Sequence, residues 1–248
     1  MKVNFLIAGA QKSGTSALDS YLREHPEICM ANSKEAHFFD NDNLFQTQIV
    51  TDYSIYHSFF NPTEKHKILG EATPIYMYCY DAPRRIWQYN SSMKLVIILR
   101  NPVDRAFSHW NMQRDRGIDK LSFLESIETE RERCREALPQ QHPRFSYVDR
   151  GFYVEQLRRV WHFFPKSQTL IIRNEDLKNN PINTLNKVYD YLGVSQVDTK
   201  NIRDIHSRGY GSTMSTTERK VLQSIYENEI KELEKLLDWD CSDWIKRT

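Results

Sequence analysis

The stretch FLIAGAQKSGTSALDSYL, from Phe5 to Leu22, decides the fold that we expect. It opens with an apolar run that is typical of a buried strand. The run ends in a turn of glycine, lysine and hydroxyl residues, and an amphipathic helical pattern follows over residues 17–22. Such a strand, turn and helix present backbone N–H groups and the positive end of the helix dipole to a ligand. The stretch therefore predicts a phosphate-binding loop.

The order of residues in this loop differs from that of the common nucleoside-triphosphate loop, G-x-x-x-x-G-K-[ST]. Lys12 precedes Gly14 instead of following it. The apolar run Lys94–Leu99 is followed by Arg100, not by an acidic residue that would hold Mg²⁺. A magnesium-dependent P-loop nucleotide kinase is therefore disfavoured. For the loop taken alone, a plain strand, turn and helix with a surface lysine stays open.

Composition describes an ordinary globular chain. Of the 248 residues, 40% are apolar and 27% charged, and the net charge of +1 gives no global field that attracts nucleic acid or a membrane surface. No apolar run approaches the ~18 residues of a membrane span, and the apolar start is too short for a signal peptide. The four cysteines form no C-x-x-C pair, which favours free thiols and demands no metal. We expect a cytoplasmic protein.

Apolar runs along the chain predict buried strands, and helical patterns lie between them. The expected strands are Val3–Ala8, a weaker Glu27–Met30, Ile68–Gly70, Lys94–Leu99 and Thr169–Arg173. The expected helices include residues 102–112, 154–164 and 182–192, and a last helix that begins with the capping-box sequence Ser215 to Glu218. This alternation predicts an α/β fold with a mostly parallel sheet covered on both faces. Ligands then bind outside the carboxyl ends of the strands, where residues 9–16 and 100–108 border one crevice.

No repeat, low-complexity tract or linker divides the chain, so we expect one domain over residues 1–248. The segment 113–150 is highly charged and loses its periodicity after about residue 137. We expect it to leave the sheet as an excursion that covers the site.

A second loop, from Arg100 to Ser108, follows the run Lys94–Leu99. An arginine fork and a hydroxyl suit a terminal phosphate. For Asp104 and Arg105 we expect a structural role, as an ion pair that fixes the turn. Two anion sites at neighbouring strand ends indicate a ligand with two separated phosphate groups.

Several motifs, taken in order, resemble those of the sulfotransferases that use 3′-phosphoadenosine 5′-phosphosulfate (PAPS). These motifs are GAQKSGTSAL, KEAHFFD (Lys34–Asp40), GEATPIY (Gly70–Tyr76), LRNPVDRAFSHW and RGFYVEQLRRVWHFFP (Arg150–Pro165). The similarity is greatest to the branch of heparan sulfate sulfotransferases and bacterial small-molecule sulfotransferases. The resemblance implies a central parallel sheet of roughly five strands flanked by helices, in a single domain with a P-loop-like fold. It also implies sulfuryl transfer without a metal and release of adenosine 3′,5′-bisphosphate.

The resemblance implies a role for each nucleotide-binding motif. Lys12 would contact the 5′-phosphosulfate and take part in catalysis, and the 3′-phosphate would lie between Arg100 and Ser108. Further donors to the 5′-phosphosulfate would be Ser13, Gly14, Thr15 and Ser16. A basic-glycine-aromatic loop would close over the nucleotide within residues 203–214, and its members would be Arg208, Gly209 and Tyr210.

The resemblance also implies that Glu35 is the catalytic base and His37 its close partner. On a strand both side chains would share one face. Burial beside two phenylalanines would raise the pKa of Glu35 and improve it as a base. His37 stays open as the base itself or as a structural hydrogen-bond partner, and Glu35 as half of a surface pair with Lys34. Asp40 either orients the acceptor or caps the following turn.

The acceptor is the least defined part of this function. Related glycosaminoglycan enzymes often carry a lysine where this sequence has Ala72, and their polyanionic substrates favour basic clefts. We therefore expect a small-molecule acceptor, such as a guanidinium toxin or another natural product, sulfated on a hydroxyl or on an amine or guanidine nitrogen. A glycan sulfotransferase is the alternative, followed by a non-catalytic module that binds the bisphosphate. Oxygen or nitrogen as the target and the oligomeric state stay open.

Overall fold

The computed structural model describes residues 2–46, 51–197 and 211–245. The chain divides into two compact units. The first unit contains Met1–Leu99 and Arg159–Ser207, and the second contains Arg100–Arg158 and Arg208–Thr248. One domain over the whole chain stays a prediction, as do the assigned roles of residues 113–150 and 203–214.

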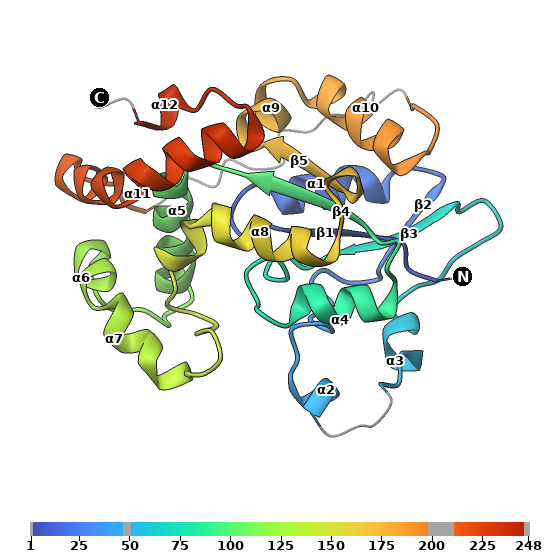
Figure 1. The fold of residues 1–248 in the computed structure, drawn as a ribbon, viewed down its shortest axis with the longest axis horizontal. Coiled ribbons are helices and arrows are strands. Elements are labelled where there is room, and N and C mark those ends of the chain that lie inside the picture. The colour runs from blue at the N-terminus through green and yellow to red at the C-terminus, as the bar shows by residue number, and fades with distance from the viewer. Residues whose placement is uncertain (1, 47–50, 198–210, 246–248) are drawn as a thin grey trace. The chain divides into compact units, whose positions relative to one another are not determined.

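The first unit contains a five-stranded sheet in the order β2-β3-β1-β4-β5 (Figure 1). All neighbouring strands are parallel. The strands are β1 (Phe5–Gly9), β2 (Ile28–Met30), β3 (Ile68–Ala72), β4 (Lys94–Leu99) and β5 (Thr169–Arg173). Each coincides with a predicted apolar run to within two residues at either end. The predicted α/β fold with a five-stranded parallel sheet is therefore confirmed.

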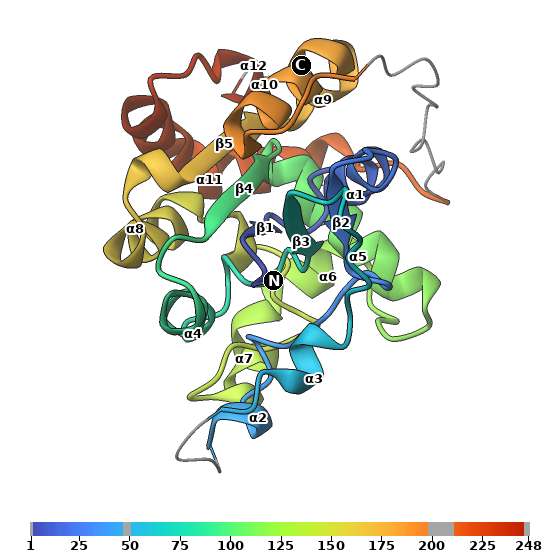
Figure 2. The same cartoon turned by 90° about the vertical axis from the view of Figure 1, so that its right-hand side faces the viewer.

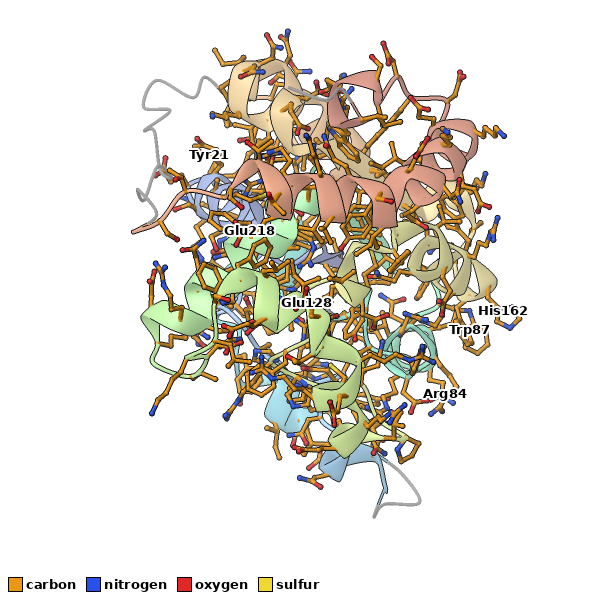
Figure 3. All side chains as sticks on the ribbon, turned by 90° about the vertical axis from the view of Figure 1, so that its left-hand side faces the viewer. Tyr21, Arg84, Trp87, Glu128, His162 and Glu218 are labelled. Atoms are coloured by element: carbon orange, nitrogen blue, oxygen red, sulfur yellow. The ribbon has the colours of Figure 1, made fainter. Side chains whose placement is uncertain are left out.

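Helices cover both faces of this sheet within the first unit (Figures 1 and 2). One face carries α1 (Thr15–Arg23), α9 (Asn174–Asn179) and α10 (Pro181–Leu192), and the other carries α4 (Ala82–Tyr89). Leu18 of α1 and Val188 of α10 share one buried cluster with Ile7 and Val96 of the central strands. Two short helices, α2 (Asn43–Gln46) and α3 (Ser54–His57), lie between β2 and β3 in the chain. Figure 3 shows the exposed side chains Arg84 and Trp87, which come from α4.

A glycine fixes the contact between β1 and β3. Phe5 of β1 lies opposite Gly70 of β3 in the parallel register, and Leu6 lies opposite Glu71. A Cβ atom on Gly70 would lie 2.1 Å from the Phe5 ring, so only glycine fits at this close approach. The register in turn places Glu71 in the interior of the unit, where it is 0% exposed.

The second unit is mainly helical. It contains α5 (Pro102–Asp115), α6 (Phe123–Glu128), α7 (Glu130–Cys134), most of α8 (Tyr153–Phe163), α11 (Thr216–Leu237) and α12 (Ser242–Ile245), with single 3₁₀ turns at Arg135–Ala137 and Asp149–Gly151. A third 3₁₀ turn, Lys166–Gln168, precedes β5 in the first unit. The predicted capping box of α11 is present, with Ser215 and Glu218 exchanging hydrogen bonds (Figure 3 labels Glu218).

The sequence predicts free thiols and no membrane-spanning segment. All four cysteines are free thiols. Over residues 2–46, 51–197 and 211–245, no helix has both the length and the apolar character needed to cross a membrane.

Candidate active site

The loop after β1 has an unusual backbone. Lys12 has a φ of 71° and Gly14 a φ of 95°, so both lie in the left-handed region that non-glycine residues seldom adopt. The side-chain amide of Asn174, the first residue of α9, donates a hydrogen bond of 2.9 Å to the carbonyl oxygen of Ser13. The loop is therefore held from a second element in the conformation that places Lys12 and Ser13 directly before α1.

The end of this loop is equipped to bind an anion. Gly14 is the N-cap of α1, and no side chain caps the helix there. Thr15 and Ser16 form the first turn, where the dipole of a helix favours negative charge. The hydroxyl of Ser13 is buried and has no hydrogen-bond partner among the described residues. A buried hydroxyl without a partner costs free energy, and a phosphoryl oxygen would satisfy it. The residues of the loop therefore fit a phosphate group.

The loop after β1 lies at the topological switch point of the sheet, where the connections from two neighbouring strands leave in opposite directions. β1 and β4 are neighbours, and the chain continues from β1 toward β2 on one side and from β4 toward β5 on the other. In open α/β sheets, ligands bind outside the carboxyl ends of two such strands. The loop at residues 10–14 follows β1, and Arg100 is the next residue after β4 in the chain.

A cluster of charged side chains lies in the segment Lys34–Asp40, which we call the Glu35 segment. Lys34 Nζ lies 3.0 Å from one carboxylate oxygen of Glu35, and His37 Nε2 lies 3.2 Å from the other. His37 Nδ1 lies 2.8 Å from Asp40 Oδ2. The expected neighbours Glu35 and His37 are thus together, and the Lys34–Glu35 pair that we left open also exists. The segment is irregular and His37 has a φ of 49°, so the two side chains meet without the strand geometry that would put them on one face.

The cluster keeps Glu35 ionised and His37 protonated. Burial acts to raise the pKa of Glu35, but the hydrogen bond from His37 and the charge of Lys34 outweigh it, so the pKa lies below its ordinary value. Hydrogen bonds to Asp40 and to Glu35 raise the pKa of His37 to about 10. The predicted rise in the pKa of Glu35 is therefore wrong, because two cations beside the carboxylate outweigh the effect of burial.

Sequence reasoning missed three buried side chains close to the Glu35 segment. Glu71, Thr73 and Tyr76 are each 0% exposed. Thr73 Oγ1 lies 3.0 Å from the backbone nitrogen of Ala36, and the Tyr76 hydroxyl lies 3.1 Å from that of Phe38. An acidic residue in an otherwise apolar strand, ILGEA, was the signal that could have found them.

In the second unit, Arg100 and Ser108 occupy different settings. Arg100 lines a cavity of about 360 Å³ together with Asp104, Phe107, Arg219 and residues 212–214. Ser108 is buried on α5 and is not among the residues that line this cavity. The first turn of α5 is fixed by Asn101, whose side chain accepts a hydrogen bond of 3.0 Å from Val103 N. The Tyr153 hydroxyl donates a hydrogen bond of 2.9 Å to the carbonyl oxygen of Arg100.

The expected ion pair between Asp104 and Arg105 is absent from the described contacts. Asp104 pairs instead with Arg219 of α11 at 2.8 Å. Arg105 is fully buried and donates to the carbonyl oxygen of Tyr147. Successive residues of a helix point in different directions, so Asp104 and Arg105 each find a partner on another element. The motif Arg208, Gly209 and Tyr210 lies outside the described residues.

Known proteins resemble this chain in sequence and in fold. A sequence profile of the sulfotransferase domain matches residues 2–240. Human heparan sulfate glucosamine 3-O-sulfotransferase 6 is 32% identical over 196 residues, which cover 78% of this chain and 53% of that protein. The chain spans about half the length of the curated relatives it matches.

Solved structures give the same result for the fold. The crystal structure of a sulfotransferase from Alicyclobacillus acidocaldarius is similar with a TM-score of 0.83 at 30% identity, and the match covers 99% of this chain and 100% of that chain. Mouse sulfotransferase SULT7A1 complexed with PAP shares the fold, with a TM-score of 0.56 at 14% identity over 96% of this chain and 87% of that chain. Since the profile spans nearly all of the sequence, the chain belongs to the sulfotransferase family.

Proposed function

We propose that this protein transfers a sulfuryl group from PAPS to a small-molecule acceptor and releases adenosine 3′,5′-bisphosphate. The observation that carries the proposal is the charged cluster at Glu35, where an ionised carboxylate is held by Lys34 and His37. PAPS dependence is the general property of the family to which the chain belongs.

The loop after β1 would hold the 5′-phosphosulfate. Lys12 supplies a positive charge, and the backbone N–H groups at Gly14 and the start of α1 supply donors. The buried hydroxyl of Ser13 would gain the partner that it lacks among the described residues. Thr15 and Ser16 would add further donors. The cation and the donors would stabilise negative charge on the departing phosphate, so we propose that no metal ion is needed.

The 3′-phosphate would be held by Arg100 and Ser108, as the motif resemblance implies. Arg100 is the better supported of the two, because it lines a cavity in the second unit. The motif Arg208, Gly209 and Tyr210 would close over the nucleotide.

Bound PAPS would supply the sulfuryl group and a bisphosphate leaving group. Glu35 would accept the proton of the acceptor as the new bond to sulfur forms and the bond between sulfur and the bridging phosphate oxygen breaks. His37 would not be the base, because a group whose pKa is raised to about 10 already carries its proton at neutral pH. It would instead orient Glu35 through their contact of 3.2 Å, while Asp40 orients His37.

Two observations bear on the acceptor. Ala72 ends β3 and is 1% exposed, so it supplies no cation where related glycosaminoglycan enzymes often have a lysine. This supports a small acceptor with a hydroxyl, amine or guanidine group. The 32% identity to a heparan sulfate glucosamine 3-O-sulfotransferase favours a glycan as the second candidate.

The free thiols and the net charge of +1 support a cytoplasmic protein that binds neither nucleic acid nor membrane.

The test combines binding with transfer. Calorimetry should show that the protein binds adenosine 3′,5′-bisphosphate without added metal. Radiolabelled PAPS should then deliver sulfate to one or more members of a panel of phenols, amines, guanidines and heparan oligosaccharides. Absence of bisphosphate binding would exclude the proposal. Binding without transfer would leave the non-catalytic module as the better description, and ATP hydrolysis that requires Mg²⁺ would favour the kinase.

A further inference from the structure

A carboxylate without access to solvent lies beneath the Glu35 segment. Glu71 is 0% exposed on β3, the second strand from the edge of the sheet. Its Oε2 accepts a hydrogen bond of 2.7 Å from the hydroxyl of Thr73, and its Oε1 accepts a longer one of 3.4 Å from Tyr56. The hydroxyl of Tyr76 also acts to lower the pKa of this carboxyl group and so favours its ionised form. Three hydroxyl groups therefore surround one buried acid.

Two of these hydroxyls also accept hydrogen bonds from the Glu35 segment. The Thr73 hydroxyl accepts from the backbone N–H of Ala36 at 3.0 Å and, more weakly, from that of His37 at 3.4 Å. The Tyr76 hydroxyl accepts from Phe38 at 3.1 Å and from the next amide, that of Phe39, at 3.5 Å. The backbone N–H groups of residues 36–39 thus donate to only two side chains, Thr73 and Tyr76, which both belong to the GEATPIY motif.

The direction of these hydrogen bonds follows from the chemistry of the groups. An amide N–H can only donate, so each hydroxyl must offer its lone pairs to the segment. The single hydroxyl proton must then point elsewhere. That of Thr73 points to Glu71 at 2.7 Å, and the Tyr76 hydroxyl also favours the ionised form of Glu71. The carboxylate therefore sets the orientation in which Thr73 and Tyr76 can receive the amides.

We propose that Glu71 positions the Glu35 segment through the hydroxyl groups of Thr73 and Tyr76. Glu71 itself is a positioning residue and touches no reacting atom. The backbone of residues 36–39 lies between the side chains of Glu35 and Asp40, so fixing these amides fixes the ends of the charged cluster. The expected effect of this positioning on turnover rests on the proposed function of Glu35. The hydrogen-bond arrangement itself does not depend on that function.

Burying the charge of Glu71 costs free energy. Burial, together with the negative charges of Asp40 and Glu35, raises the pKa of Glu71 to about 7, although the hydroxyl hydrogen bonds act to lower it. A buried acid is an expensive way to stabilise a fold, because isosteric apolar packing often does as well. Its role in orienting two hydroxyls toward one irregular segment explains what the acid does there.

The test is amide hydrogen exchange of the full chain, measured residue by residue by NMR. Thr73→Val removes the hydroxyl, whereas Thr73→Ser keeps it and serves as the matched control. We expect the Ala36 amide to exchange about tenfold or more faster in Thr73→Val and at the wild-type rate in Thr73→Ser. In Tyr76→Phe the Phe38 amide should be the one that accelerates. Amides of β4 should keep their wild-type rates in all three variants.

Glu71→Leu removes both acceptor oxygens, so this one substitution should accelerate both the Ala36 and the Phe38 amides. Should this variant fail to fold, the Thr73 and Tyr76 variants decide. Wild-type exchange of Ala36 in Thr73→Val, or equal acceleration in Thr73→Val and Thr73→Ser, would overturn the proposal. So would Glu71→Leu if it leaves either amide unchanged.

A second readout links position to turnover. With an acceptor found in the panel, Thr73→Val should lower kcat by about tenfold and leave the KM for PAPS within about twofold, and Thr73→Ser should restore kcat. Faster exchange of Ala36 with unchanged kcat would refute the role in turnover. If no acceptor is ever sulfated, the proposed function fails while the exchange experiment still tests the positioning by Glu71.

Discussion

Two buried carboxylates, one in each unit, hold irregular segments in different ways. Glu130 of the second unit accepts hydrogen bonds directly from the backbone amides of Val148 at 2.7 Å and Asp149 at 2.9 Å. Glu71 of the first unit has hydroxyl groups between itself and the chain that it holds. Burial raises the pKa of each to about 7.

The difference indicates what each contact is for. A carboxylate bonded directly to amides anchors a chain, and the positive charge of Arg105 nearby favours its ionised form. Hydroxyls between carboxylate and amides extend the reach of the acid and keep its charge one group away from the Glu35 segment. That segment already contains two carboxylates, Glu35 and Asp40, so a third one in direct contact would add repulsion.

The largest expected effect is on the rate of sulfate transfer. It distinguishes Glu35, the proposed base, from Glu71 and Glu130, which hold backbone segments. Glu35→Gln should lower sulfate transfer by about 100-fold or more, because the base is lost, while the Kd for adenosine 3′,5′-bisphosphate stays within about twofold. The measurement is initial rate with radiolabelled PAPS, beside calorimetry. Glu64→Gln, at an exposed position, is the control and should behave as wild type. Turnover of Glu35→Gln within a few-fold of wild type would show that Glu35 is not the base.

The second effect concerns the pH dependence of stability that Glu71 causes. The pKa of this carboxyl rises from 4.5 to about 7 on folding, so the unfolded chain loses the proton first as pH rises. Its contribution to the free energy of unfolding is therefore present below pH 4.5 and falls as pH increases toward 7, by about 3 kcal/mol at most.

Urea unfolding at several pH values tests this effect. The fall in stability between these limits should be smaller in Glu71→Gln than in wild type, since the amide does not titrate. The groups that face Glu71 are the hydroxyls of Thr73, Tyr56 and Tyr76 and the charges of Asp40 and Glu35. Equal pH profiles for the two proteins would mean that Glu71 does not titrate in this range.

A third effect tests the direct anchor. Glu130→Ala removes the acceptor of two amides, so the free energy of unfolding should fall by about 2 kcal/mol. Glu136→Ala, at an exposed position in the same region, should change it by no more than about 0.5 kcal/mol. Chemical denaturation measures both. If the two substitutions have equal effects, the hydrogen bonds from Val148 and Asp149 add no stability.

The smallest effect is spectroscopic. The imidazole of His37 should titrate near pH 10 in NMR spectra, because Asp40 and Glu35 stabilise its charged form. Asp40→Asn should lower this midpoint, since it removes the first of the two hydrogen-bonded charges. A raised histidine pKa adds stability below its unfolded value of 6.5, and this contribution is lost as pH rises toward 10. A midpoint near 6.5 in the wild-type protein would contradict the ionic cluster.

Much of the fold follows from local sequence. The five apolar runs were sufficient to find the strands, because buried parallel strands are apolar on both faces. Ser215 and Glu218 defined the start of α11 for a similar reason, since a capping box is complete within four residues. The family resemblance likewise rested on contiguous motifs.

The parts that sequence reasoning missed depend on contacts between distant residues. The conformation of the Glu35 segment did not follow from its own residues, because its amides are held by Thr73 and Tyr76, about 37 residues further along the chain. Two adjacent phenylalanines suggested a raised pKa for Glu35. The sequence could not show that Lys34 and His37 both turn toward that carboxylate. In the same way, Asp104 was paired with its neighbour in sequence, while its partner is Arg219 of α11.

The contact between Gly70 and the Phe5 ring has a consequence for engineering. Because β3 keeps its register only while residue 70 lacks a side chain, the adjoining Glu71 has no freedom to shift along the strand. Mutant libraries that aim at a new acceptor should therefore spare the GEATPIY motif and place their diversity in residues 41–45 and 51–66. A library that varies Gly70 would yield inactive members through lost strand alignment, whatever pocket the remaining mutations create.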